Sequence, residues 1–192
     1  MKNVVSLHIN IHEMSTIKLK DKCFRTYLKE DEILKAIDGV AEKINGDFRG
    51  CSDVPVLLCV LNGAVVFASE LMRRLDFDFE FASLKIRSYE GTHSTGKVSY
   101  VDALNGGVEG RRVIVCEDIV DSGNSMEFLR AYLKERGASD IRICSMLFKP
   151  EMFRKDFKVD YYAMSISNEF IVGFGLDYDE LGRGLRDIYI IK

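Results

Sequence analysis

The sequence predicts an α/β protein with a mainly parallel central sheet flanked by helices, and three observations support this class. Residues 54–61 form a continuous apolar run, which is typical of a strand that a parallel sheet buries on both faces. Residues 31–48 carry apolar side chains at helical spacing, which indicates an amphipathic helix. Strand-like and helix-like segments then alternate along the chain, and this order favours parallel strands joined by crossover helices.

The remaining elements follow the same alternation. We expect, in chain order, a helix at 64–75, a strand at 77–86, a strand at 113–116, a helix at 124–136 and strands at 141–148, 161–166 and 187–191. Residues 1–12 indicate a short strand or arm, and the Gly-, Ser-, Thr- and Asn-rich residues 87–110 indicate a long loop with room for a short hairpin.

The length and composition suit one domain and exclude several classes of protein. We expect residues 1–192 to form a single domain, with a core at about 31–166 and a small hood from 1–30 and 167–192. Hydrophobic residues make up 47% of the chain, and the net charge of −3 argues against a nucleic-acid-binding protein. The five cysteines lack CxxC spacing and favour a reduced, cytoplasmic compartment. The most apolar stretch, 56–72, is interrupted by polar residues and is too short to span a membrane.

The residues that carry the chemistry lie between Val113 and Ser125. An apolar strand leads into two adjacent carboxylates, Glu117 and Asp118, and a third, Asp121, follows three residues later. Four residues that expose backbone N–H groups or supply hydroxyls come next: Ser122, Gly123, Asn124 and Ser125. Ligands of open α/β sheets bind at the carboxyl ends of strands, and a small-residue loop entering a helix N-terminus suits a phosphate group.

Three carboxylates beside a phosphate site would repel a polyanion. Either a divalent cation bridges the acids and the ligand, or the acids bind hydroxyl groups instead of phosphate. A sugar phosphate with a ribose diol and a magnesium-bound pyrophosphate satisfies both conditions. The alternative is a solvated strand end followed by an ordinary helix cap, and the combination of acids and small residues makes this the less favoured interpretation.

The segment from Val113 to Ser125 resembles the phosphoribosyl-pyrophosphate-binding motif of type I phosphoribosyltransferases. That motif has an apolar strand, two acids and two apolar residues before Asp-Ser/Thr-Gly-x-Ser/Thr, and the match here is full length. The resemblance covers roughly residues 25–192. Over that length the chain is more similar to the hypoxanthine-guanine branch of the family than to its orotate, uracil or adenine branches.

Two stretches resemble the loops that this branch uses around the leaving group. Leu61, Asn62 and Gly63 stand where the branch has its pyrophosphate loop, which contains an unusual cis peptide in the family. Asn62 departs from the Lys or Arg often found there, so a cationic side-chain contact at this position is in question. Ser88 and Tyr89, with a Ser-Thr-Gly triplet after them, resemble the mobile loop that closes over the reacting centre.

The C-terminal third resembles the part of the family that recognises the purine. Lys149 matches the lysine that reads the exocyclic oxygen of the base. Phe170, Ile171 and Asp177 resemble residues of the hood segment that holds the base, with Phe170 stacking on it. Asp177 and Arg183 match residues implied to bind magnesium and pyrophosphate, respectively.

The resemblance implies a purine salvage transferase that moves the phosphoribosyl group from phosphoribosyl pyrophosphate to hypoxanthine or guanine and releases pyrophosphate. Glu117 and Asp118 would then hold the ribose hydroxyls and, with Asp177, a Mg²⁺ ion. Asp121 is the expected general base or acceptor at the purine imidazole edge, and the loop after it is expected to bind the 5′-phosphate. Tyr89 would shield the reaction from water.

Two other functions stay open at this point. One is a transferase that prefers xanthine, and the other is a phosphoribosyl-pyrophosphate-sensing regulator that acts on nucleic acid. The regulator would call for a basic face or an added DNA-binding module, and neither is evident at a net charge of −3. The family implies a homodimer or homotetramer, whereas the role of residues 1–20 is open.

Overall fold

The computed structural model describes residues 15–88, 98–102 and 107–192, with only the backbone described for 87–88 and 98–102. The arm expected at residues 1–12 and the predicted site residue Tyr89 lie outside these ranges. Among the described residues, no helix is long and apolar enough to cross a lipid bilayer.

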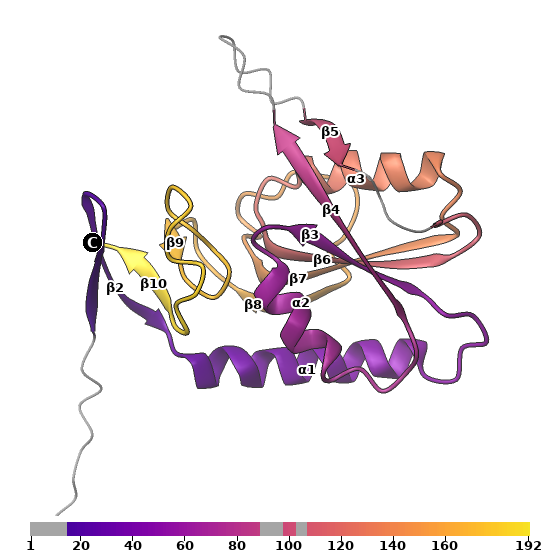
Figure 1. The fold of residues 1–192 in the computed structure, drawn as a ribbon, viewed down its shortest axis with the longest axis horizontal. Helices are drawn as coiled ribbons and strands as arrows, with labels where there is room; N and C mark the ends of the chain where they lie inside the picture. The colour runs from indigo at the N-terminus through magenta and orange to yellow at the C-terminus, as the bar shows by residue number, and fades with distance from the viewer. Residues whose placement is uncertain (1–14, 89–97, 103–106) are drawn as a thin grey trace, which may run out of the picture.

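A six-stranded sheet forms the centre of the molecule (Figure 1). Its strands are β3 (Val56–Leu61), β4 (Glu80–Ser88), β5 (Val98–Asp102), β6 (Arg112–Val120), β7 (Asp140–Phe148) and β8 (Tyr161–Ser165). They lie in the order β5-β4-β3-β6-β7-β8, and all neighbouring pairs are parallel except β4 with β5. The predicted α/β class with a mainly parallel sheet is confirmed.

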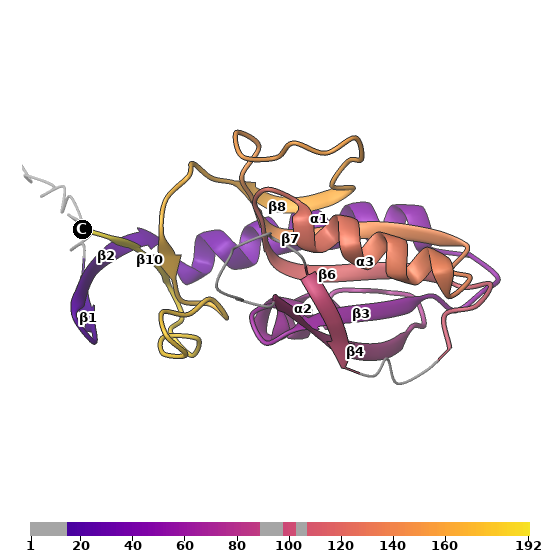
Figure 2. The ribbon, with the colours of Figure 1, turned by 90° about the horizontal axis from the view of Figure 1, so that it is seen from above.

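Helices cover both faces of this sheet (Figure 2). The helices α1 (Glu30–Phe48) and α2 (Val65–Met72) pack on one face, where Ile37 and Phe67 meet Leu57 and Ile114. The helix α3 (Asn124–Glu135) packs on the other face, where Leu129 belongs to the same buried cluster as residues of β3 and β6. Because β3 and β6 are covered on both sides, their sequences are apolar without alternation.

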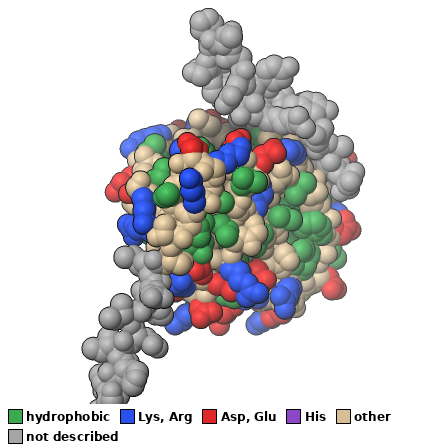
Figure 3. Space-filling model, turned by 60° about the vertical axis from the view of Figure 1, so that its left-hand side comes forward, with side chains coloured by type: hydrophobic (Ala, Val, Ile, Leu, Met, Phe, Trp, Pro, Cys, Tyr) green, Lys and Arg blue, Asp and Glu red, His purple; other side chains and the backbone are tan. Residues whose placement is uncertain are grey.

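A second, antiparallel sheet forms the hood from both ends of the chain. Its strands are β1 (Thr16–Leu19), β2 (Lys22–Leu28), β9 (Ile171–Val172) and β10 (Ile188–Ile191), in the order β1-β2-β10-β9. The predicted strand at 187–191 therefore lies in the hood, and the hairpin of β1 and β2 was not predicted as strands. Figure 3 brings the hood side forward and shows hydrophobic side chains exposed across this face, with charged side chains around them.

Two further differences from the predicted elements bear on the site. The predicted strand at 113–116 continues to Val120, because its pairing with β7 extends to the partners Val120 and Phe148. The acidic pair Glu117–Asp118 thus lies inside a strand and not after it. Within the predicted loop 87–110, β5 returns antiparallel to β4, which confirms a hairpin there.

Asp187 joins the hood to the core at the start of α1. Its Oδ1 accepts a hydrogen bond from the Glu30 backbone N–H at 2.9 Å, and its Oδ2 lies 2.9 Å from Lys29 Nζ. A carboxylate that accepts from the first turn of a helix satisfies a backbone donor and interacts favourably with the helix dipole. Asp187 directly precedes β10, so one side chain couples the small sheet to the long helix of the core.

Replacing Asp187 with Ala should lower the free energy of unfolding by about 1 kcal/mol, the usual cost of losing a helix-capping acceptor. Asp187→Asn keeps an acceptor oxygen and should cost less. Urea unfolding followed by circular dichroism measures both values. Equal stability of the Ala variant and the unmodified protein would show that this contact does not connect the two sheets energetically.

Candidate functional site

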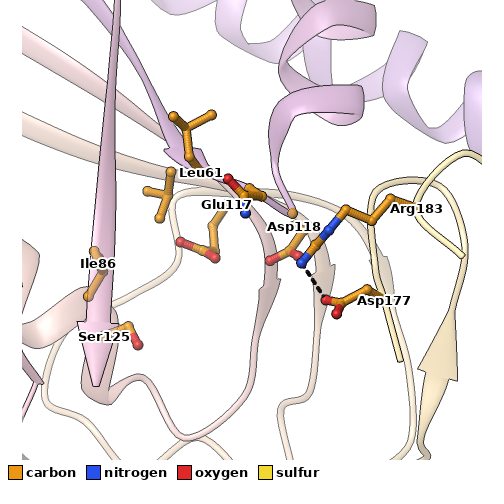
Figure 4. A pocket seen from close by; sticks show the side chains of 10 residues that line it. Leu61, Ile86, Glu117, Asp118, Ser125, Asp177 and Arg183 are labelled. Carbon is orange, nitrogen blue, oxygen red and sulfur yellow. Dashed lines mark ion pairs between the residues drawn. The ribbon is translucent and has the colours of Figure 1, made fainter. Parts of the chain in front are cut away.

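A pocket of about 260 Å³ opens at the carboxyl ends of the parallel strands (Figure 4). Its walls come from the ends of β3, β4 and β6, the first turn of α3 and the segment after β9. The lining residues are Val60, Leu61, Asn62, Gly63, Ile86, Glu117, Asp118, Ser125, Asp177 and Arg183. This is the edge of the sheet at which α/β proteins bind ligands. All of these lining residues except Val60 and Ile86 were predicted as site residues.

The adjacent acids Glu117 and Asp118 both line the pocket from the end of β6 (Figure 4). Earlier residues of this strand alternate between the two faces of the sheet, with Val113 and Val115 on the α3 side and Ile114 and Cys116 on the α1 side. The two carboxyl groups lie close enough for each to affect the pKa of the other.

Burial makes both carboxyl groups hard to ionise. Burial, followed by the charge of Asp118, raises the pKa of Glu117 well above its ordinary value. Burial also raises the pKa of Asp118, although hydrogen bonding, including that from the Ile119 N–H at 2.8 Å, and the charge of Arg183 act to lower it. Positive charge brought by a ligand would offset this cost.

Gly63 brings its backbone against Asp118. A Cβ atom at position 63 would lie 1.6 Å from Asp118 Oδ2, so no larger residue fits without displacing that carboxylate. On the other side, a Cβ atom at Gly175 would lie 2.2 Å from the Gly63 carbonyl oxygen, and Gly175 has a φ of +100°. The peptide bond between Leu61 and Asn62 in this loop is cis. Two close approaches therefore fix this loop, one to the Asp118 side chain and one to the Gly175 backbone.

Arg183 and Asp177 reach the pocket as an ion pair from the hood. Arg183 Nη2 lies 2.7 Å from Asp177 Oδ1, and Arg183 Nη1 donates to the Gly175 carbonyl at 2.9 Å (Figure 4). Asp177 Oδ2 accepts from the Glu180 N–H at 2.7 Å. The residues predicted to bind pyrophosphate and metal are therefore neighbours, and Asp177 already uses both carboxylate oxygens within the protein.

The loop between β6 and α3 stands beside the pocket. Asp121 is exposed, and its Oδ1 accepts from the Ser122 backbone N–H and lies 3.1 Å from Ser122 Oγ. Gly123 has a φ of +82° and turns the chain into α3, which begins at Asn124. Ser125 alone of this loop lines the pocket described above. The remaining loop residues and the N-terminus of α3 lie next to this pocket, and their backbone N–H groups suit a phosphate.

The predicted purine residues gather between the sheet and the hood. Lys149 Nζ donates to the Glu169 carbonyl at 2.8 Å and lies 3.4 Å from Asn168 Oδ1, directly before Phe170. Phe170 is 44% exposed. The Ile171 side chain is buried in the core, so only its backbone is placed to meet a ligand. The structure thus brings Lys149 close to the backbone just before Phe170, and neither residue is among those that line the pocket.

Sequence reasoning missed three contributors to the site. Val60 and Ile86 line the pocket because they stand at the carboxyl ends of β3 and β4, and strand-end position was the signal that could have identified them. Gly175 supports the Gly63 loop, and its sequence pattern carried no such indication. Of the mobile loop, Ser88 is described only by its backbone at the end of β4, and Tyr89 lies outside the described residues.

The oxygen donors at the pocket fit a magnesium ion that a ligand helps to hold. Glu117 Oε2 is buried and has no hydrogen-bond partner among the described residues. In the same part of the chain, no three His, Cys, Asp or Glu side chains lie close enough to bind a metal ion by themselves. The predicted ligands Glu117, Asp118 and Asp177 therefore do not form a cage of three carboxylates. Mg²⁺ commonly uses one or two carboxylates together with water and substrate phosphates, which agrees with this arrangement.

Comparison with known proteins matches residues 25–179 to the phosphoribosyl transferase domain family. A hypoxanthine-guanine phosphoribosyltransferase from Streptococcus thermophilus is 38% identical over 164 residues, which cover 85% of this chain and 90% of the relative. The bifunctional protein TilS/HprT from Listeria monocytogenes is 36% identical over 169 residues, 88% of this chain and 26% of that longer protein.

Solved structures give the same result. A hypoxanthine-guanine phosphoribosyltransferase from Bacillus anthracis superposes with a TM-score of 0.80 at 32% identity, covering 87% of this chain and 96% of that one. A hypoxanthine phosphoribosyl transferase from Trypanosoma cruzi superposes with a TM-score of 0.82 at 29% identity, covering 92% and 95%.

Replacing Gly175 with Ala should lower the free energy of unfolding by roughly 1–3 kcal/mol, because the new methyl group meets a backbone oxygen that no side-chain rotation can move. Gly39→Ala is the matched control, since a Cβ atom there meets nothing within 4 Å in the middle of α1. That control should stabilise the protein by up to about 1 kcal/mol. Denaturant titration of both variants checks the prediction, and similar behaviour of the two would contradict it.

Proposed function

The chain belongs to the phosphoribosyl transferase domain family, and from this premise we propose how its site acts on substrates. It is a purine salvage transferase that moves the phosphoribosyl group from phosphoribosyl pyrophosphate to hypoxanthine and guanine, forming the nucleotide and pyrophosphate. The observation that carries the donor half of this proposal is the meeting of the Gly63 loop, Asp118 and Arg183 at one edge of the sheet.

The donor occupies the pocket and the adjoining loop. Residues Ser122 to Ser125 and the N-terminus of α3 bind the 5′-phosphate through backbone N–H groups and hydroxyls. Glu117 and Asp118 accept hydrogen bonds from the ribose hydroxyls. Arg183, together with the backbone of Leu61, Asn62 and Gly63, binds the pyrophosphate; this assignment does not require a cationic side chain at position 62.

Displacement at the anomeric carbon builds positive charge on the ribose ring, as in glycoside cleavage. The carboxylates beneath the ring stabilise that charge, and Arg183 stabilises the negative charge that develops on the leaving group. Ser88 and Tyr89 close over the donor and exclude water, which would otherwise compete with the purine for the same carbon.

The acceptor lies between Lys149 and Phe170. Lys149 donates to the exocyclic oxygen of the purine, and this contact disfavours adenine, which carries an amino group there. Phe170 stacks on the base, the Ile171 backbone contacts its edge, and Asp121 accepts the proton that leaves the reacting imidazole nitrogen. The support for Lys149 and Phe170 acting together is the bond from Lys149 to the residue before Phe170.

We further propose that Mg²⁺ is required. Glu117 and Asp118, with Asp177 through water, would hold the ion, which neutralises charge on the pyrophosphate when bound. The buried Oε2 of Glu117, which has no hydrogen-bond partner in the described part of the chain, supports this assignment.

The organisation of the whole protein is proposed on the same basis. Residues 1–192 act as one catalytic domain, with a core at about 31–166 and the hood formed from both ends. The protein works in the cytoplasm as a homodimer or homotetramer. In the similar enzyme from T. cruzi, the C-terminal region has a role in the oligomeric state and the activity, and this supports the proposal of an oligomer.

The direct test incubates the purified protein with phosphoribosyl pyrophosphate, Mg²⁺ and each of hypoxanthine, guanine, xanthine and adenine. Nucleotide should form with hypoxanthine and guanine, and its formation should stop when the divalent cation is chelated. Faster turnover of xanthine would instead identify a xanthine-preferring enzyme. No nucleotide with any base would overturn the proposed reaction.

Asp121→Asn should reduce kcat by roughly 10²–10⁴-fold with little change in the KM of either substrate, because the amide cannot take up the purine proton. Asp156→Asn, at an exposed aspartate away from the pocket, is the matched control and should leave both constants unchanged. Steady-state kinetics with hypoxanthine gives the comparison. An unchanged kcat in Asp121→Asn would remove this residue from proton transfer.

Lys149→Gln should raise the KM for hypoxanthine by roughly 10–100-fold, since a hydrogen bond from a charged donor to a buried acceptor contributes about 1.5–3 kcal/mol. The KM for phosphoribosyl pyrophosphate should stay nearly constant, and discrimination against adenine should weaken. The same substitution at Lys158, which is exposed, serves as the control. A Lys149 variant that still rejects adenine fully would assign specificity to other residues.

A further inference from the structure

The hairpin of β1 and β2 precedes most of the residues that match the family. Residues 16–24 lie before the matched range, which begins at Arg25. Lys20 and Asp21 form the turn of this hairpin, and the register pairs Leu19 with Lys22. These residues have no part in the proposed mechanism, yet they contact the rest of the hood.

The backbone of the hairpin docks next to the proposed base-stacking residue. β2 pairs with β10, and β10 pairs with β9, which directly follows Phe170. The Ile191 N–H donates to the Phe170 carbonyl at 3.0 Å, and the Lys192 N–H donates to the Cys23 carbonyl at 3.0 Å. The last two residues of the chain thus connect the hairpin to the backbone of Phe170, since one bonds to Phe170 and the other to Cys23 of β2.

Lys22 holds its ammonium group over two aromatic rings of the hood. Nζ lies 4.5 Å from the centroid of the Tyr178 ring and 5.1 Å from that of Phe170. The two rings meet edge to face, with centroids 5.8 Å apart and an angle of 89°. A cation within about 6 Å of a ring face is attracted by the ring quadrupole. One ammonium group therefore favours a single mutual orientation of the two rings.

Phe24 supports the same pair of rings from within the hood. It is fully buried, and its centroid lies 6.2 Å from those of both Phe170 and Tyr178. Side chains two residues apart on a strand share a face, so Lys22 and Phe24 both point toward these rings. With these neighbours in place, Phe170 still exposes 44% of its surface, which leaves it area for contact with a planar base.

The turn of the hairpin contacts the next residues along the hood. The Tyr178 hydroxyl donates to Asp21 Oδ1 at 2.7 Å, and Lys20 forms an ion pair with Asp179. Exposed contacts of this kind stabilise little individually. Both contacts involve the two residues that follow Asp177. Together with Lys22 over the Tyr178 ring, three successive residues of the hairpin therefore contact residues 178–179.

From these contacts we propose that the β1–β2 hairpin forms an outer part of the purine site, and that Lys22 positions the Phe170 ring for stacking on the base. This inference rests on the proposed function, because it takes Phe170 as the stacking residue. Lys22 acts through Phe170 and Tyr178 and does not contact the reacting atoms. Its effect falls on the acceptor, since the donor pocket is lined from β3, β4, β6, α3 and the segment after β9.

Lys22→Met, which keeps an unbranched side chain of similar length and removes its charge, tests the proposal. The loss of two cation–π contacts should raise the KM for hypoxanthine and guanine by roughly 3–10-fold. The KM for phosphoribosyl pyrophosphate and kcat should stay within about twofold, because neither depends on the Phe170 ring in the proposed mechanism. Lys22→Arg retains a cation that stacks on aromatic rings and should restore the low KM for the base.

Lys18→Met is the matched control, since Lys18 is exposed on the other strand of the same hairpin. Direct binding of the product nucleotide, measured by calorimetry, gives a second readout that does not depend on turnover. An unchanged purine KM in Lys22→Met, an equal rise in the KM for phosphoribosyl pyrophosphate, or the same effect in Lys18→Met would each overturn the proposal. If the unmodified protein forms no nucleotide, the proposed function itself fails, which is a distinguishable result.

Discussion

The close contact between the Gly63 loop and Asp118 is the constraint on which the rest of the site depends. Position 63 has no room for a Cβ atom, since that atom would lie 1.6 Å from the Asp118 carboxylate. Gly175 approaches the same loop from the hood, and Arg183 donates to its carbonyl. A backbone loop, a strand carboxylate and a hood segment therefore occupy neighbouring positions. Interactions of this kind hold catalytic groups in place without long side chains that must be ordered on binding.

The two sheets supply different parts of the site. The parallel sheet brings the ends of β3, β4 and β6 together and places Glu117 and Asp118 in the pocket, where we propose that they hold ribose and metal. The hood segment after β9 carries Asp177 and Arg183 into the same pocket, and in the proposed function the half-exposed Phe170 meets the base. Because the hood is built from both ends of the chain, contacts within its N-terminal hairpin can influence base binding without altering the donor pocket.

The electrostatics of the pocket follow from this division. Glu117 and Asp118 are costly to ionise where they lie, since burial raises the pKa of both. The only cationic side chain that lines the described pocket is Arg183, and it is already paired with Asp177. The site is therefore organised for a ligand that brings positive charge with it, and a magnesium-bound pyrophosphate meets that requirement.

The amino-acid sequence by itself determined the fold class, most elements of the parallel sheet and the donor motif. Buried parallel strands require continuous apolar runs, and phosphate loops require small residues, so both are local patterns. The sequence did not indicate the length of β6, the β1–β2 hairpin or the strand order of the hood sheet, because pairing partners distant in the chain decide these. Only the tertiary structure placed Gly175 against Gly63, paired Arg183 with Asp177, and set Lys22 over Phe170. Two of these contacts join segments more than a hundred residues apart, and the pairing of Arg183 with Asp177 depends on how the loop between them folds back, so no local spacing encodes them.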